Sequence, residues 1–231
     1  MDVVTDYIRL MSPGITLLVM LTGFIGLWMG ARGELIPSLS LWCLLGIGLA
    51  SAGSSIFNNY YDMDIDRIME RTSKRALPTG RIKPKTALFI GVMLSISSFT
   101  ILTVFVNLLS ALLTMLALIT YSYLYTILLK RHTPAATEIG GISGSLPPVI
   151  GWVAVRGSIS LEAIILFMIM YLWQPPHFWA LGLKFKDDYK RAGIPTMSVV
   201  KSKDEIILKS IYYVSLLFLV SLLPYFLGVV G

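Results

Sequence analysis

The sequence is dominated by seven apolar runs, and each is long enough to cross a lipid bilayer as an α-helix. Such a helix needs about 20 predominantly apolar residues. Charged residues make up only 14% of the chain, whereas soluble domains carry about 25%. We therefore expect an all-α, polytopic membrane protein with about seven transmembrane helices. The runs cover residues 13–30, 38–60, 85–106, 108–129, 135–155, 161–183 and 206–230.

Two features of these runs predict how the helices pack. Only residues 106–107 separate the third run from the fourth, which predicts a tight antiparallel hairpin. The fifth run carries a small-xxx-small pair, Gly140 and Gly144, and a diproline at 147–148. A helix with so many breakers is tolerated in lipid only where it lies against other helices or a cavity.

Most of the charge lies in two long polar loops, residues 61–84 and 184–205. With seven spans, both loops fall on one side of the membrane, together with all but Arg32 and Arg156 of the 19 basic residues. The positive-inside rule makes that side cytoplasmic. A role limited to orientation and contact with anionic lipid is the alternative, and this placement argues against nucleic-acid binding. The lone cysteine, Cys43, excludes a disulfide.

An acidic stripe leads from the second run into the first polar loop. Asn58, Asp62 and Asp66 are spaced four residues apart, so a continuing helix would stack them on one face. Carboxylates so close repel one another unless a cation lies between them. Mg²⁺ fits, because it binds one or two carboxylates and completes its shell with water and substrate phosphates. Asp64 points elsewhere and is a candidate for a second ion or for capping the loop.

A basic cluster follows the acidic stripe directly, with Arg67, Arg71, Lys74 and Arg75. A metal bridges the oxygens of a diphosphate, and arginine binds the remaining oxygens as a bidentate fork. The two groups together therefore predict a diphosphate site, with Asp62, Asp66 and Arg71 as catalytic residues. The alternative is a charged helix end with internal salt bridges.

Three groups of residues resemble, in the same order, signature motifs of the intramembrane aromatic prenyltransferase (UbiA-like) superfamily. Their details are most similar to its protoheme IX farnesyltransferase (heme O synthase) branch. The resemblance covers about residues 5–230. The groups are Asn58, Asp62, Asp66, Met69, Arg71, Thr72 and Arg75; then Lys130, Arg131, His132, Thr133 and Pro134 with Gly140, Gly141, Pro147, Pro148, Gly151 and Trp152; then residues 173–180, 186–189 and 192–195.

The resemblance implies a ring-like bundle that forms a single prenyltransferase domain over residues 1–231. The family pattern has nine spans, so we expect a C-terminally shortened member without the last two. Members open with a Lys-Pro-Arg element before the first span, and this chain has neither charge at residues 11–14.

The implied reaction transfers a farnesyl group from farnesyl diphosphate to a vinyl group of heme B, with Mg²⁺ as cofactor. A quinone precursor or another aromatic acceptor is the alternative within the superfamily. A transporter or channel is the alternative from another class, since intramembrane acids often mark ion paths. Proteins that deliver heme or assemble a terminal oxidase are the expected partners, besides the bilayer.

The second polar loop supplies further candidates. Asp187 and Asp188 are adjacent, so on a helix they point about 100° apart and cannot share one ion. Lys184 and Asp188 are four residues apart and share a face. We interpret Asp188 as a ligand of a second metal, and Lys184 as a catalytic residue that binds the diphosphate or, alternatively, forms a salt bridge to Asp188. A solvated turn is the alternative. Asp187 and Tyr189 are substrate-binding candidates through the resemblance.

His177 follows a diproline at 175–176 near the end of the sixth run. We expect the prolines to break the helix there and open its backbone toward a cavity. Because the implied acceptor is a heme, His177 is a candidate for positioning it. Diphosphate contact and a structural role remain open. Lys130 and Arg131 are substrate-binding candidates, and His132 beside them is expected at the surface or near phosphate.

Overall fold

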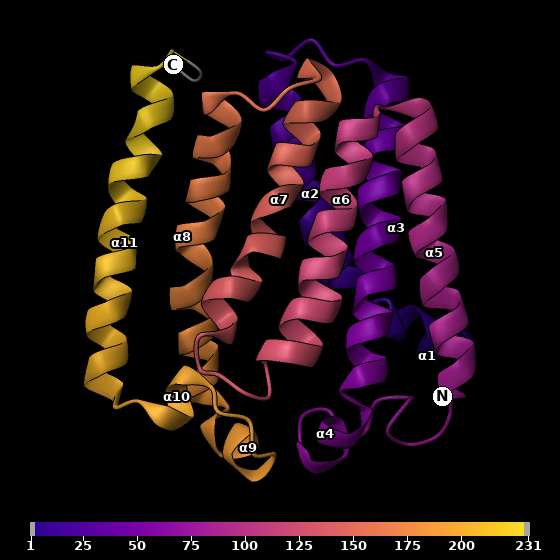
Figure 1. The fold of residues 1–231 in the computed structure, drawn as a ribbon, viewed down its shortest axis with the longest axis vertical. Coiled ribbons are helices and arrows are strands. Elements are labelled where there is room, and N and C mark those ends of the chain that lie inside the picture. Colours follow the sequence, from indigo (N-terminus) through magenta and orange to yellow (C-terminus); the bar gives the residue numbers. More distant parts are fainter. Residues whose placement is uncertain (1–2, 229–231) are drawn as a thin grey trace.

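The computed structural model describes residues 3–228, and the regular elements in that part of the chain are all helices. The long helices run alongside one another, and α4, α9 and α10 gather at one end, called the polar end below (Figure 1). In chain order the elements are α1 (Val3–Leu10), α2 (Pro13–Gly30), α3 (Pro37–Tyr61), α4 (Met63–Ile68), α5 (Pro84–Phe105), α6 (Leu108–Ile119), the π-helix η1 (Thr120–Leu129), α7 (Ala136–Arg156), α8 (Leu161–Lys184), α9 (Lys186–Arg191), α10 (Met197–Val200) and α11 (Lys203–Phe226).

The predicted spans are confirmed as helices. Six helices, with α6 and η1 counted together, are long and apolar enough to cross a membrane. The 21-residue α7 is the seventh long helix of the bundle, and its prolines, glycines and serines lower its hydropathy. The expected hairpin is also present, because α5 ends at Phe105 and α6 begins at Leu108. Asn107 caps α6 by accepting a hydrogen bond from the backbone N–H of Ser110 at 2.8 Å.

The helix α7 lies at the centre of the bundle and packs on α2, α6, η1 and α8. At its crossing with α2 the two backbones touch. A Cβ on Gly26 would lie 1.8 Å from the carbonyl oxygen of Pro148, and a Cβ on Gly151 would lie 2.0 Å from that of Gly23. Only glycine permits this approach, so the small residues of both helices determine how closely they pack.

The predicted small-residue pair on α7 also packs closely, but against two different helices. A Cβ on Gly140 would lie 2.5 Å from the ring of Tyr125 on η1, and a Cβ on Gly144 would lie 2.2 Å from the side chain of Gln174 on α8. The helix continues through Pro147 and Pro148, both buried. Burial among neighbouring helices allows a membrane helix to keep prolines in its interior.

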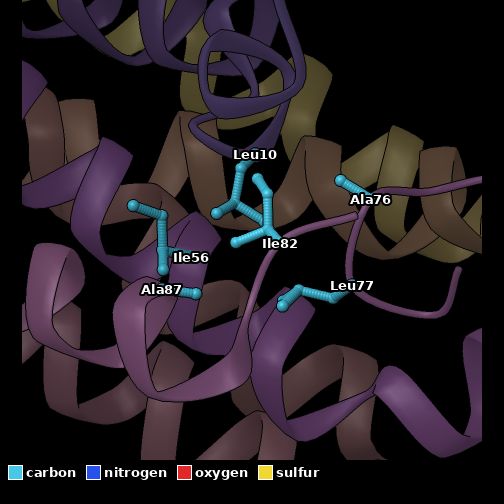
Figure 2. Close-up of a cluster of buried hydrophobic side chains, with 6 residues drawn as sticks. All are labelled: Leu10, Ile56, Ala76, Leu77, Ile82 and Ala87. Atoms are coloured by element: carbon cyan, nitrogen blue, oxygen red, sulfur yellow. The ribbon is translucent and has the colours of Figure 1, made fainter. Parts of the chain in front are cut away.

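The first polar loop is fixed to the bundle by an apolar cluster at the polar end (Figure 2). The cluster joins Leu10 of α1, Ile56 of α3, Ala87 of α5 and three loop residues, Ala76, Leu77 and Ile82. An ion pair reinforces it, because the guanidinium of Arg81 donates to both oxygens of Asp6 at 2.6 and 3.1 Å. The loop therefore has a defined position relative to α3, whose end carries the acidic stripe.

Candidate active site

The acidic stripe spans the junction between α3 and α4. Although α3 ends at Tyr61, the backbone N–H of Asp62 still donates to the carbonyl of Asn58 at 2.9 Å. The N–H of Asp66 then donates to the carbonyl of Asp62 at 2.7 Å. The i to i+4 backbone hydrogen bonds of a helix therefore continue across the junction. The side-chain amide of Asn58 donates to the Asp62 carboxylate at 2.9 Å.

Both carboxylates of the stripe are buried, and a cation faces each. Asp62 is 1% exposed, and its Oδ2 accepts from Asn58 and from the ammonium of Lys130. Asp66 is 4% exposed and accepts from Arg75 at 2.7 Å. The Oδ1 of Asp62 is buried and has no hydrogen-bond partner among residues 3–228. A buried carboxylate oxygen without a partner is costly, so this atom is ready to accept a donor or a cation.

The donor set fits Mg²⁺ bound together with a substrate. Within the described residues, no three acidic, histidine or cysteine side chains gather closely enough to enclose a metal alone. Mg²⁺ does not need such a cage, because it is commonly held by one or two carboxylates and completes its shell with phosphate oxygens and water. Asp62, with its open oxygen, and Asp66 one turn away match that arrangement. Asn58 reaches the stripe through the amide N–H that it donates to Asp62.

Lys184 and Asp188 of the second polar loop form no salt bridge, which was one of the two roles expected for Lys184. The chain turns at Phe185, between the end of α8 and the start of α9, and the two residues no longer share one helix face. Asp188 instead accepts from the backbone N–H groups of Glu70 and Arg71, at 3.3 and 3.4 Å. Asp187, the neighbouring substrate-binding candidate, is exposed.

Asp188 is ionised in this setting. Burial works to raise the pKa of its carboxyl, but the N–H groups of Glu70 and Arg71 and the guanidinium of Arg191 hold that pKa below its usual range. The carboxylate therefore carries a full negative charge where the two polar loops meet.

The basic residues at the polar end divide into those that have a carboxylate partner and those that have none. Arg131 binds both oxygens of Asp64 at 2.7 and 2.8 Å and holds the pKa of that carboxyl below its usual range. This pairing accounts for Asp64, for which a second ion was one expectation. Arg67 donates to the carbonyl of Pro78 at 3.2 Å. Lys74 is exposed, and its carbonyl accepts from Arg81.

Arg71 and Lys184 are two of the basic residues without a carboxylate partner. Neither side chain has a carboxylate within ion-pair distance in the described part of the chain. The Arg71 guanidinium lies 5.1 Å from the centre of the Phe185 ring, and the Lys184 ammonium lies 5.5 Å from the same centre. Two cations from different loops, both predicted to be catalytic, therefore share one aromatic ring.

A pocket opens at the polar end beside Lys130. It lies between η1, the start of α7, the end of α8 and the second polar loop, and Tyr125, Trp179 and Tyr189 are among its lining residues. The indole N–H of Trp179 is buried and has no hydrogen-bond partner within residues 3–228. The ammonium of Lys130, which contacts Asp62, makes this pocket suited to an anionic group.

Comparison with known proteins identifies the family. Residues 19–231 match the UbiA prenyltransferase family. The chain belongs to that family. It is 52% identical over 229 residues to the protoheme IX farnesyltransferase of Aquifex aeolicus (strain VF5), covering 99% of this chain and 78% of the relative. It is 44% identical over 205 residues to the enzyme of that name from Trichodesmium erythraeum (strain IMS101), covering 89% of this chain and 62% of the relative.

Solved structures confirm the UbiA fold. A digeranylgeranylglyceryl phosphate synthase superposes with a TM-score of 0.82 at 23% identity, covering 100% of this chain and 80% of the other. A UbiA homolog from Archaeoglobus fulgidus, bound to DMAPP and Mg²⁺, superposes with a TM-score of 0.74 at 18% identity, covering 93% and 76%. The resemblance inferred from the motifs is thus confirmed, and the protein is a multi-pass membrane prenyltransferase.

In this UbiA prenyltransferase the expected helix break before His177 does not occur. The helix α8 runs unbroken from Leu161 to Lys184, through both prolines. It is packed between α7 and α11, and Gln174 donates to the carbonyl of Met170 at 3.1 Å. His177 is exposed and stacks on Trp173, with ring centres 4.6 Å apart. His132 is exposed, as expected.

Sequence reasoning left the aromatic residues of the prenyltransferase site unassigned. Tyr125 reaches the pocket from η1, where it stacks on Tyr121 at 5.6 Å. A π-helix winds more loosely than an α-helix and is frequent at functional sites. Tyr121, Tyr123 and Tyr125 alternate along the sequence, but no sequence signal specifies that this segment is π-helical. Because the winding of this helix was not known from the sequence, the direction in which each tyrosine ring points could not be predicted.

Proposed function

We propose that this prenyltransferase transfers a farnesyl group from farnesyl diphosphate to a vinyl group of heme B and thereby makes heme O. The open oxygen of Asp62, buried beside Lys130 and one turn from Asp66, carries the diphosphate part of the proposal. The name protoheme IX farnesyltransferase, shared by relatives 39–52% identical to this chain, supports heme B as acceptor and farnesyl as donor.

Binding of the diphosphate would use residues of both polar loops. Asp62 and Asp66 would hold Mg²⁺, which neutralises charge on the leaving diphosphate when bound. Lys130 and Arg75 contact these carboxylates and would supply positive charge beside the diphosphate. Arg71 and Lys184 lack carboxylate partners in the described chain and would contribute further charge-assisted hydrogen bonds.

The chemical step would begin when the allylic C–O bond breaks and the diphosphate leaves with the electron pair. The terminal vinyl carbon of the heme then bonds to C1 of the farnesyl group, and water adds to the resulting cation and loses a proton. Cationic groups around the diphosphate stabilise the charge that develops on it. Aromatic faces such as Tyr125 and Trp179 would attract the allylic cation and exclude water until capture.

The acceptor would be oriented by the aromatic pair of Trp173 and His177. Their stacked rings are exposed on one side of α8 and offer a flat surface for a porphyrin. We also propose that the polar end faces the cytoplasm, because the basic residues concentrate there. Proteins that deliver heme or assemble a terminal oxidase remain the proposed partners.

The direct test incubates the purified protein with heme B, farnesyl diphosphate and Mg²⁺ and measures heme O by mass. Asp62→Asn and Asp66→Asn should lose turnover while remaining folded. Glu34→Gln is the matched control, since Glu34 is exposed in the loop between α2 and α3. Farnesylation of a hydroxybenzoate without heme O would assign another acceptor, and ion flux in liposomes without any product would favour a transporter.

The heme role of His177 has a separate test. His177→Ala should weaken heme B binding, or change its Soret spectrum, more than it weakens farnesyl diphosphate binding. Equal loss of both ligands, or an unchanged spectrum, would assign His177 to the diphosphate or to structure.

A further inference from the structure

The two polar loops dock onto each other through a small apolar core of their own. Ile65 and Met69 from the first loop and Ile194 from the second are each only 3–4% exposed. Tyr189 and Ala192 pack against them. Figure 1 shows α4 and α9, which carry parts of these loops, at the same end of the bundle. The loops, more than 110 residues apart in sequence, thus form one folded unit over the site.

Asp188 is the polar link at this contact. Its Oδ1 accepts from the backbone N–H of Glu70 and from Arg191, and its Oδ2 accepts from the backbone N–H of Arg71. Arg191 also lies 3.7 Å from the carboxylate of Glu70. Both oxygens of Asp188 are therefore engaged, and the side chain is 8% exposed. A carboxylate held this way has little free coordination capacity, in contrast to Asp62 with its open oxygen.

The backbone that Asp188 holds belongs to Arg71, whose guanidinium lies over Phe185. The ammonium of Lys184 lies over the same ring. The Phe185 ring attracts each cation, but the two positive charges repel each other, so an anion bound near them would offset that repulsion. Phe185 directly follows Lys184 and lies three residues before Asp188. One short segment thus positions both cations.

We propose that Asp188 is a positioning residue: it fixes the backbone at Arg71 so that Arg71 meets Lys184 on the Phe185 ring, rather than binding Mg²⁺. The inference rests on the proposed prenyl diphosphate site. The two cations then form a second diphosphate contact, supplied by both loops, besides the one at Asp62 and Lys130.

The test is a double-mutant cycle on the binding of inorganic pyrophosphate to the purified protein with Mg²⁺ present. Asp188→Asn replaces one carboxylate oxygen, which accepts a backbone hydrogen bond, with an NH₂ group that cannot accept one. This substitution should weaken pyrophosphate binding about tenfold, and Arg71→Ala should weaken it by a similar factor. In the Arg71→Ala background, Asp188→Asn should weaken pyrophosphate binding by less than about a further twofold. An equal loss in both backgrounds would overturn the proposal. Asp204→Asn, an exposed carboxylate at the start of α11, is the matched control.

Two further measurements keep the proposal testable if Asp188→Asn folds poorly. Phe185→Leu removes the ring and no carboxylate, and its effect on pyrophosphate affinity should also disappear in the Arg71→Ala background. For Asp188→Asn, the Mg²⁺ concentration at half-saturation, measured with saturating pyrophosphate, should stay within about twofold of the wild type. An increase of about tenfold or more is typical of a lost metal contact and would overturn the proposal.

The outcome also separates this inference from the proposed function. Failure of the wild-type protein to bind pyrophosphate with Mg²⁺ would refute the diphosphate site itself. Normal wild-type binding together with additive effects of the two substitutions would refute only the positioning role of Asp188.

Discussion

Replacing Lys130 with methionine should destabilise the ligand-free protein by about 3 kcal/mol. The side chains of Lys130 and Asp62 are 17% and 2% exposed, so water screens their ion pair weakly. Loss of one partner of a buried pair costs about 3–5 kcal/mol, because the other charge stays buried without compensation. Asn58 still donates to Asp62 at 2.9 Å, which places the loss near the lower limit of that range.

The assay is reversible unfolding in mixed micelles, followed by tryptophan fluorescence in buffer with a chelator. The Asp62→Asn/Lys130→Met double variant should recover most of the loss, since it leaves no unpaired buried charge. Lys85→Met is the matched control, because Lys85 is exposed at the start of α5, and it should change stability by less than about 0.5 kcal/mol. If the free energy of unfolding of Lys130→Met lies within about 1 kcal/mol of the wild-type value, the reasoning from a buried Lys130–Asp62 ion pair is refuted.

Two further predictions concern the scaffold. Gly26→Ala should cost about 3 kcal/mol or more, because its Cβ would lie 1.8 Å from the Pro148 carbonyl oxygen. Gly14→Ala, with no neighbour within 4 Å, should be neutral or stabilising, and equal thermal unfolding of the two variants would contradict the close crossing. The hydrogen bond from Arg81 holds the pKa of the Asp6 carboxyl below its usual range. That contribution is complete above about pH 4 and is lost as pH falls through the lowered pKa. The difference in unfolding midpoint between wild type and Asp6→Asn should therefore shrink in acid, and a difference independent of pH would exclude the ion pair.

Much of this protein follows from local features of its sequence. The apolar runs specify the long helices, because a membrane-spanning segment must satisfy its backbone hydrogen bonds internally and carry about 20 apolar residues. The spacing of Asn58, Asp62 and Asp66 predicts one stripe, since helical periodicity depends only on neighbours in the chain. The motifs around this stripe were specific enough to predict the family.

Helix continuity and pairing depended instead on the tertiary structure. The sequence predicted a break before His177, but α8 continues through Pro175 and Pro176 because α7 and α11 enclose it. A salt bridge from Lys184 to Asp188, four residues away, was one expectation, but Asp188 instead accepts from the backbone of Glu70 and Arg71, 118 and 117 residues away. Hydropathy locates the membrane spans and the polar loops, and helical periodicity predicts which charged residues share one face of a helix. Which charges meet is decided only when the helices pack and bring the two polar loops together.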